Sequence, residues 1–225
     1  MPFHRLFAIL LLAALPGACA TAPTNLGELK TTLTAYHDSG AYMRDLAAVD
    51  TEATQWLAAS APKSARPALV LDIDETSLSS WDVMAANDFG YISAGSCDAL
   101  PKGPCGSRAW ELSARGTVIA PTLVLFNAAK AAGVAVFFIT GRPEDERDAT
   151  ARNLRAAGFE GWAGLVLKPL DLRVASAADY KAPARAAIEA QGYTIIANVG
   201  DQPSDLAGGH ALRTFLLPNP FYRIH

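Results

Sequence analysis

The sequence has no excess of basic residues, because 19 Lys and Arg stand against 22 Asp and Glu, which gives a formal net charge of −3. Proteins that bind nucleic acid need a basic face, so no nucleic-acid polymer is expected as a partner. Internal repeats and low-complexity segments are missing as well. With 225 residues, of which 51% are hydrophobic, the chain suits one globular domain with a small insertion.

Hydrophobic runs long enough to span a bilayer are also missing. The apolar run near the N-terminus, residues 6–15, has ten residues and follows the basic residue Arg5. A transmembrane helix needs about 20 apolar residues, so this run is too short to be one. A basic start followed by a short apolar run predicts a signal peptide over residues 1–19, and therefore export from the cytoplasm.

The processing site of this signal peptide has two interpretations. Residues 15–19 resemble a bacterial lipobox, and this predicts a lipid on Cys19. The fit is imperfect, because Leu15 lies four residues before the cysteine and Pro16 takes the usual place of the leucine. Residues 18–20 also fit an A-x-A cleavage site, which would release a soluble protein. We expect a periplasmic or outer-membrane lipoprotein tethered through Cys19, and otherwise a secreted protein.

Cysteine is scarce, and two of the three cysteines lie close together. Cys97 and Cys105 flank a loop, residues 98–104, that is rich in Gly and Pro. In an exported protein two nearby cysteines tend to pair, so we expect a disulfide here. Two free, buried thiols are the alternative.

The rest of the chain alternates between strand and helix patterns. Residues 68–71 form a continuous apolar run, which is typical of a strand buried on both faces. The other expected elements are helices over 28–60, 121–132, 143–157 and 179–191, with Pro143 at a first helical position, and strands over 134–139, 165–167, 194–199 and 213–217. This alternation predicts an α/β protein, a parallel sheet with helices on both faces.

The expected domain organisation follows from these elements. Residues 20–66 are interpreted as a tether and helical extension, and residues 67–225 as the α/β domain. The pattern is unclear over about 77–119, so this stretch is interpreted as a small cap insertion above the end of the first strand. Such sheets bind ligands beyond the carboxyl ends of their strands.

Polar residues follow the first two expected strands. Asp72 and Asp74 come after the first strand, and residues two apart on an extended segment point the same way. Two close carboxylates repel each other and need a cation or a shared proton. Thr140 and Gly141 follow the second strand, just before the expected helix, and this arrangement predicts an anion site.

Two later segments also carry charged residues that could belong to this site. Lys181 lies near the start of the expected third helix of the α/β domain, and Asp201 and Asp205 follow the strand over 194–199. Carboxylate oxygens without His or Cys nearby suit Mg²⁺ better than Zn²⁺.

The order of these motifs resembles the haloacid dehalogenase (HAD) superfamily. D-x-D-E-T begins at Asp72, T-G-R at Thr140, the lysine is Lys181, and G-D-x-x-x-D ends at Asp205. The likeness is closer to its subfamily IIIB, which contains bacterial lipoprotein acid phosphatases and plant vegetative-storage-type proteins. It covers roughly residues 67–220 and implies a HAD-like Rossmannoid sheet.

The resemblance also implies roles for the motif residues. Asp72 would be the nucleophile and Asp74 the general acid and base. Mg²⁺ would bind Asp72, the Asp74 backbone carbonyl and Asp201, with Asp205 as a weaker candidate. The phosphoryl group would be held by Thr140, Gly141 and Lys181. Arg142 would either reach the phosphate or form a structural salt bridge, and Glu75 would either support the site or be a helix-start charge.

The expected activity is hydrolysis of small phosphomonoesters with Mg²⁺ as cofactor, nucleoside monophosphates being candidate substrates. Three aromatic residues of the insertion, Trp81, Tyr91 and Trp110, would then stack on a nucleobase or form the insertion's own core. We prefer the second of these. The alternative function is a non-catalytic storage or phosphate-ligand-binding protein on the same fold.

Overall fold

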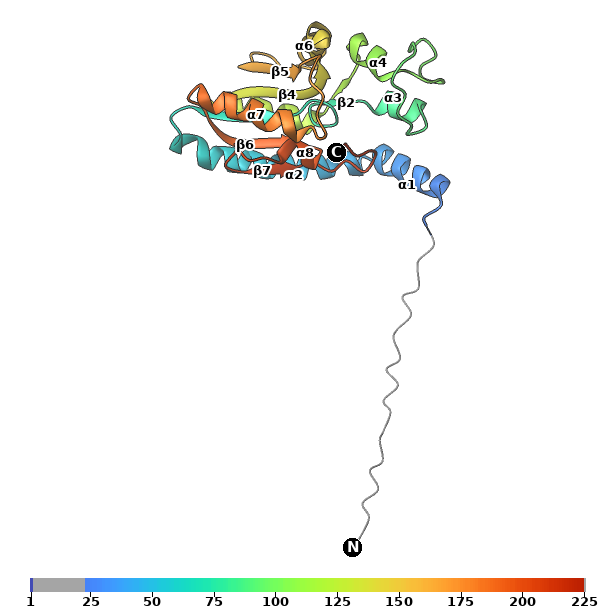
Figure 1. Cartoon of the computed structure of the whole chain (residues 1–225), viewed down its shortest axis with the longest axis horizontal. Coiled ribbons are helices and arrows are strands. Elements are labelled where there is room, and N and C mark those ends of the chain that lie inside the picture. The colour runs from blue at the N-terminus through green and yellow to red at the C-terminus, as the bar shows by residue number, and fades with distance from the viewer. Residues whose placement is uncertain (2–22, 225) are drawn as a thin grey trace.

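The predicted α/β class is confirmed by the structure, a computed structural model that describes residue 1 and residues 23–224. The predicted signal peptide and Cys19 lie outside the described residues. The main sheet has five strands, all parallel, in the order β5-β4-β1-β6-β7 (Figure 1). Its strands are β1 (Pro67–Leu71), β4 (Ala135–Pro143), β5 (Gly164–Lys168), β6 (Thr194–Gly200) and β7 (Thr214–Leu216).

The N-terminal extension is helical, as expected, but it contains two helices rather than one. α1 (Leu26–Asp38) and α2 (Ala41–Ser60) are separated at Ser39 and Gly40. Gly40 has φ = 72°, a left-handed conformation that a side chain disfavours and that interrupts the helical hydrogen bonds. A short 3₁₀ turn, η1 (Ala61–Lys63), then leads into β1.

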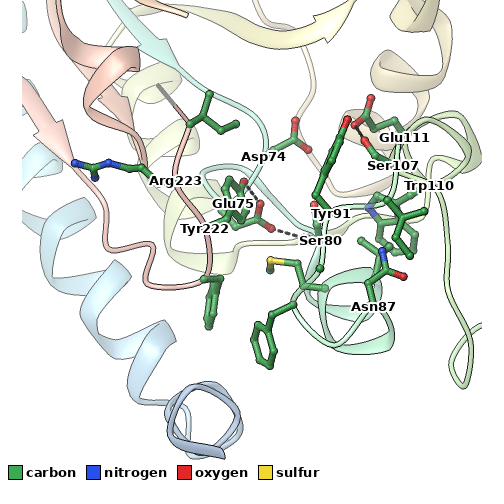
Figure 2. A pocket seen from close by; sticks show the side chains of 17 residues that line it. Asp74, Glu75, Ser80, Asn87, Tyr91, Ser107, Trp110, Glu111, Tyr222 and Arg223 are labelled. Atoms are coloured by element: carbon green, nitrogen blue, oxygen red, sulfur yellow. Dashed lines mark hydrogen bonds between the residues drawn. The ribbon is translucent and has the colours of Figure 1, made fainter. Parts of the chain in front are cut away.

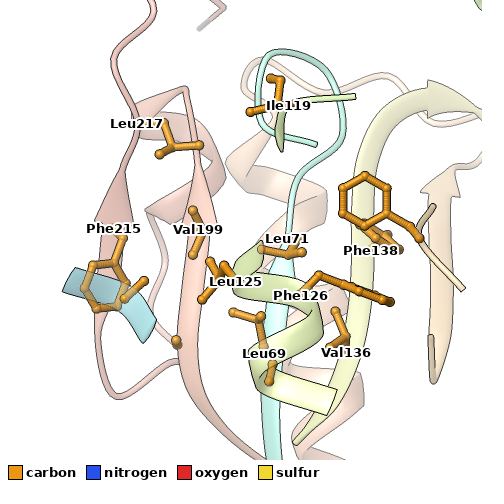
Figure 3. Packing of buried hydrophobic residues seen from close by; sticks show 14 of the residues in the cluster. Leu69, Leu71, Ile119, Leu125, Phe126, Val136, Phe138, Val199, Phe215 and Leu217 are labelled. Carbon is orange, nitrogen blue, oxygen red and sulfur yellow. The ribbon is translucent and has the colours of Figure 1, made fainter. Parts of the chain in front are cut away.

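Helices cover both faces of the sheet, as strand alternation requires. Leu69 and Leu71 of β1 point to the face covered by α2 and α5 (Ala120–Ala131), where they pack in the cluster that includes Phe126 and Phe138 (Figure 3). The alternate residues of β1 point to the other face and pack beneath α7 (Ala178–Ala190). A strand buried on both faces explains the continuous apolar run in the sequence.

The insertion after β1 has its own small core. Its base is an antiparallel pair, β2 (Leu78–Ser79) with β3 (Thr117–Val118), and it contains helices α3 (Trp81–Ala86) and α4 (Ser107–Ser113). A disulfide joins Cys97 to Cys105, the pairing expected for an exported protein. Cys105 packs with Val83 and Trp110, so Trp110 belongs to the core of the insertion.

The predicted helix start at Pro143 is wrong. β4 continues through Pro143, which is extended at ψ = 155° and lies in register with Lys168 of β5. A 3₁₀ turn, η2 (Glu144–Glu146), comes next, and helix α6 begins only at Arg147 (Arg147–Ala156). The last helix, α8 (Pro203–Leu206), follows β6. Within the described part of the chain, no helix is both long and apolar enough to cross a membrane.

Candidate active site

The carboxyl ends of the central strands bring the predicted site residues to one edge of the sheet. Asp72 directly follows β1, and its backbone N–H donates to the Val199 carbonyl of β6 at 3.0 Å. Asp201 directly follows β6, while Lys181 enters from the first turns of α7. Neighbouring parallel strands end at the same edge, so residues more than 100 positions apart in the sequence become neighbours.

Three carboxylates form a buried cluster at this edge. Asp72, Asp201 and Asp205 each offer an oxygen, and these oxygens lie within 4.8 Å of one another. The Lys181 ammonium donates to Asp72 Oδ1 at 2.5 Å and to Asp205 Oδ1 at 2.6 Å. The structure thus brings together four of the residues singled out in the sequence.

The charges of this cluster are not balanced. Burial raises the pKa of Asp72 well above its ordinary value, Lys181 lowers it, and the neighbouring carboxylates raise it further. Burial by itself lowers the pKa of Lys181, but Asp72 and Asp205 offset this and raise it. Burial and Asp205 raise the pKa of Asp201 to about 7. Three carboxylates facing one ammonium repel one another, and a further cation would relieve that repulsion.

Asp74 lies beside Asp72 in sequence but has a different partner. Its carboxylate accepts hydrogen bonds from Arg142 Nε at 3.1 and 3.2 Å and from Arg142 Nη2 at 2.6 Å. Arg142 is buried, and Asp74 raises the pKa of its guanidinium although burial opposes this. Of the two roles weighed for Arg142, the structure contains the salt bridge.

Thr140 and Gly141 lie within β4, near its carboxyl end. The Thr140 hydroxyl is fully buried and accepts a hydrogen bond from the Arg142 backbone N–H at 3.2 Å. Gly141 is exposed and lines the same cavity as Asp72. Because α6 begins at Arg147, the expectation that a helix N-terminus directly follows Gly141 is wrong.

Glu75 supports the turn after β1 rather than starting a helix. Its backbone is left-handed, with φ = 52°, and its side chain is buried. The carboxylate accepts hydrogen bonds from the Ser80 backbone N–H at 2.6 Å and from the Tyr222 hydroxyl. Burial raises the pKa of Glu75 to about 7. This residue ties the Asp74 turn to the insertion and to the C-terminal residues.

Two adjoining cavities open at this edge. One, of about 510 Å³, contains Asp72, Asp74 and Gly141. The other, of about 460 Å³, lies beneath the insertion and is lined by apolar side chains that include Trp110 and Tyr222 (Figure 2). Residues that border both cavities include Asp74, Tyr91, Ser107, Glu111 and Tyr222. The chain therefore offers an apolar space directly beside its charged one.

The aromatic residues of the insertion differ in exposure. Tyr91 is 83% exposed and borders both cavities. Trp81 stacks on His37 with ring centroids 3.7 Å apart, and it also packs against Phe89. The expectation that these aromatics form the insertion's own core therefore holds for Trp110. Trp81 packs against the main core cluster instead, and Tyr91 faces open space.

Several polar groups of the site had no role assigned to them from the sequence. Arg185 is fully buried, and its guanidinium donates to the carbonyl oxygens of Asp205 at 2.6 Å and Gly209 at 2.9 Å. Its spacing of four residues from Lys181, which puts both on one helical face, is a signal that was present. Asn219 and Gln202 donate to Asp201, and no local pattern pointed to Asn219.

A parallel sheet with carboxylates and a lysine at its carboxyl edge defines an α/β protein with a candidate site for a cation and an anionic group. A family model that matches most of the chain identifies its family. The family model described as HAD superfamily, subfamily IIIB (acid phosphatase), matches residues 18–225, and the chain belongs to this family.

Two relatives are similar in sequence to part of the chain. The stem 28 kDa glycoprotein of Glycine max is 40% identical over 118 residues, 51% of this chain and 46% of the relative. Acid phosphatase 1 of Solanum lycopersicum is 33% identical over 160 residues, 71% of this chain and 60% of the relative. The chain thus spans about half the length of these relatives.

A solved structure has the same fold over most of the chain. The class C acid phosphatase from Bacillus anthracis, with tungstate bound, superposes with a TM-score of 0.69 and 19% identity. The likeness covers 87% of this chain and 86% of that one.

Proposed function

We propose that this protein is a phosphomonoesterase that works through an aspartyl-phosphate on Asp72. The observation that carries the proposal is the contact of Lys181 with Asp72 and Asp205 at the floor of a cavity that Asp74 also borders. A nucleophile, a second carboxyl group and a buried cation around one cavity are the groups that phosphoryl transfer needs. Membership of an acid phosphatase subfamily supports the proposal.

In this mechanism the Asp72 carboxylate attacks phosphorus as the P–O bond to the leaving group breaks. Asp74 gives its proton to the departing oxygen and then takes a proton from the water that hydrolyses the acyl phosphate. The ammonium of Lys181, the hydroxyl of Thr140 and the backbone N–H of Gly141 stabilise the phosphoryl oxygens. Arg142 orients the Asp74 side chain through hydrogen bonds to both of its oxygens.

The donor set fits a divalent cation, and we propose Mg²⁺. Asp72 and Asp201 would hold it, with Asp205 as a further candidate and the Asp74 carbonyl as expected from the family resemblance. The fit rests on three buried carboxylates whose oxygens lie within 4.8 Å of one another, because hard oxygen ligands suit Mg²⁺ and close carboxylates repel one another without a cation. When bound, the cation neutralises charge on the phosphoryl oxygens and lets an anionic nucleophile approach.

We further propose a flat, partly apolar leaving group, of which a nucleoside is the natural example. The 460 Å³ cavity adjoins Asp74, where the leaving oxygen would receive its proton. Trp110, Tyr222 and the exposed Tyr91 line it, and aromatic side chains stack on nucleobases. An exported location, with the protein tethered through Cys19 or secreted, remains part of the proposal.

The test is hydrolysis of a panel of phosphomonoesters, including p-nitrophenyl phosphate and nucleoside monophosphates, with Mg²⁺ and with chelator. Asp72→Asn keeps the shape of the side chain but removes its nucleophilic charge. We expect chelator-sensitive hydrolysis by the wild type and none by the variant. Retained hydrolysis by Asp72→Asn would rule out the aspartyl-phosphate.

The alternative function is a storage or phosphate-ligand-binding role on the same fold. It would be supported if the folded wild type bound Mg²⁺ and yet hydrolysed no ester of the panel. The presence together of Asp72, Asp74, Lys181 and Asp201 favours catalysis, since storage alone needs none of them.

A further inference from the structure

A segment after the last strand borders the candidate active site. After β7, residues 219–224, here called the C-terminal segment, border both cavities through Tyr222 and Ile224. Figure 2 shows Tyr222 beside Glu75, with Asp74 at the neighbouring wall. The Tyr222 hydroxyl donates to the buried Glu75 carboxylate. The segment is thus in contact with the turn that carries Asp74.

The same segment reaches Asp201 by two routes. Asn219 Nδ2 donates to Asp201 Oδ2 at 2.7 Å, and Gln202 Nε2 donates to the same oxygen at 2.6 Å. The Ile224 backbone N–H in turn donates to Gln202 Oε1 at 3.0 Å. Oδ2 therefore accepts two amide hydrogen bonds, while Oδ1 accepts one longer bond, 3.2 Å, from Thr76.

Asn219 is itself fixed. Its Oδ1 accepts hydrogen bonds from the backbone N–H groups of Phe221 at 2.9 Å and Tyr222 at 3.4 Å. Phe221 packs against Tyr42 and Trp81, with ring centroids 5.0 and 5.3 Å apart. The donor to Asp201 is therefore held by a turn and by an aromatic cluster that joins the N-terminal helices to the insertion.

From this geometry we infer that Asn219 is a positioning residue for the metal site, holding the Asp201 carboxylate in the orientation in which it binds the cation. The inference rests on the proposed function only for the role of Asp201 as a ligand. Hydrogen-bond partners of ligating carboxylates fix the ligand's orientation, and losing one typically weakens metal binding about 10–100-fold.

The test measures Mg²⁺ binding by isothermal titration calorimetry, without substrate. Asn219→Ser is the informative variant, because a serine hydroxyl still accepts from the turn N–H groups but is too short to reach Asp201. We expect its Kd for Mg²⁺ to rise about 10–100-fold. Gln202→Leu removes the other amide donor and should shift the Kd in the same direction, so the inference stays testable if Asn219→Ser does not fold.

A matched control separates positioning from general stability. Asn153→Ala removes a buried asparagine whose side chain binds the backbone N–H and C=O of Gly116 at 2.9 and 2.7 Å. It should lower Tm and leave the Mg²⁺ Kd within twofold of wild type. Raising Mg²⁺ to saturation should restore most of kcat in Asn219→Ser, which a merely structural defect would not allow.

Two results would overturn the inference. One is a folded Asn219→Ser variant whose Kd for Mg²⁺ stays within twofold of wild type. The other is a wild type that binds no Mg²⁺, which removes Asp201 as a ligand. A wild type that binds Mg²⁺ but hydrolyses nothing would instead contradict the proposed function. The Kd values of the wild type and of Asn219→Ser for Mg²⁺ would still test the positioning role of Asn219.

Discussion

Buried carboxyl groups occur in two regions of this protein, and they differ in their partners. At the edge of the sheet, Asp72 and Asp205 share the ammonium of Lys181. On α2, which packs against α5, Asp50 is equally buried, but its Oδ2 accepts a single hydrogen bond, from the Thr122 hydroxyl at 2.9 Å. Its Oδ1 has no partner among the described residues.

The difference shows how carboxyl groups of a functional site can be distinguished from a buried carboxyl group that only destabilises the fold. Carboxylates at the edge of the sheet have a buried cation and border a cavity, so removing a partner leaves charges unpaired in the interior. Asp50 lies between two helices with one neutral partner, and burial raises the pKa of its carboxyl group to about 7. Removing the ammonium of Lys181 should therefore destabilise the first region, whereas neutralising Asp50 should stabilise the second.

The largest expected effect comes from Lys181→Met. This change removes the cation shared by Asp72 and Asp205, so the free energy of unfolding should fall by about 3–5 kcal/mol. Phosphoryl oxygens also lose a charged donor, and kcat should fall about 100–1000-fold. Urea unfolding and steady-state hydrolysis measure the two effects.

Adding Asp205→Asn to Lys181→Met serves as the control. It removes one of the two carboxylates left unpaired, so part of the lost stability should return while activity stays low. If the double variant were no more stable than the single one, the pairing account of this region would be wrong.

The next effect concerns Arg142→Lys, which keeps the charge but loses the bidentate contact with Asp74. Because Asp74 would then be held less firmly, kcat should fall about 10–100-fold. Arg147→Lys is the matched control, since Arg147 forms a half-exposed pair with Glu144 away from the cavity. Equal rates for both variants would show that Arg142 does not position Asp74.

The sheet and most of its edge could be predicted because their signals are local. Apolar runs mark the strands, and Asp72 and Asp201 stand directly after two of them. Pro143 misled the prediction because proline is favoured both at helix starts and at strand ends, and only its pairing with Lys168 distinguishes these.

Non-local contacts could not be predicted in the same way. Asn219 lies 18 residues from Asp201, in a loop after the last strand, and its donor role depends on how that loop folds back. The break at Gly40 is of another kind, since a glycine inside a helical pattern is a weak local signal.

A smaller effect on activity is expected from Tyr91→Ala. This change extends the comparison from the buried carboxyl groups to an uncharged residue that lines the site. If a nucleobase stacks on Tyr91, kcat/KM for a nucleoside monophosphate should fall about tenfold, the lower part of the range for losing one stacking contact. Hydrolysis of a small alkyl phosphate should not change. Because Tyr91 is 83% exposed, the variant should fold normally. Equal losses on both substrates would argue against stacking.

The smallest effect is expected from Asp50→Asn, and it has the opposite sign. The carboxyl group has an ordinary pKa of 3.8, and burial raises it to about 7 in the folded protein. Between these values the folded state holds a proton that the unfolded state has released, so stability of the wild type falls as pH rises from about 4 to 7. Above this window both states are ionised and the cost stays constant.

An asparagine carries no such cost and can still accept from Thr122. The variant should be about 1–2 kcal/mol more stable than wild type at pH 8, a cautious fraction of the free energy that the raised pKa represents, and nearly equal to it at pH 4. Urea unfolding at both pH values measures this, and hydrolysis should be unchanged. A gain of the same size at both pH values would mean that it does not come from the charge of Asp50. A loss at pH 8 would mean that the Asp50 carboxylate is stabilised by its surroundings, contrary to its raised pKa.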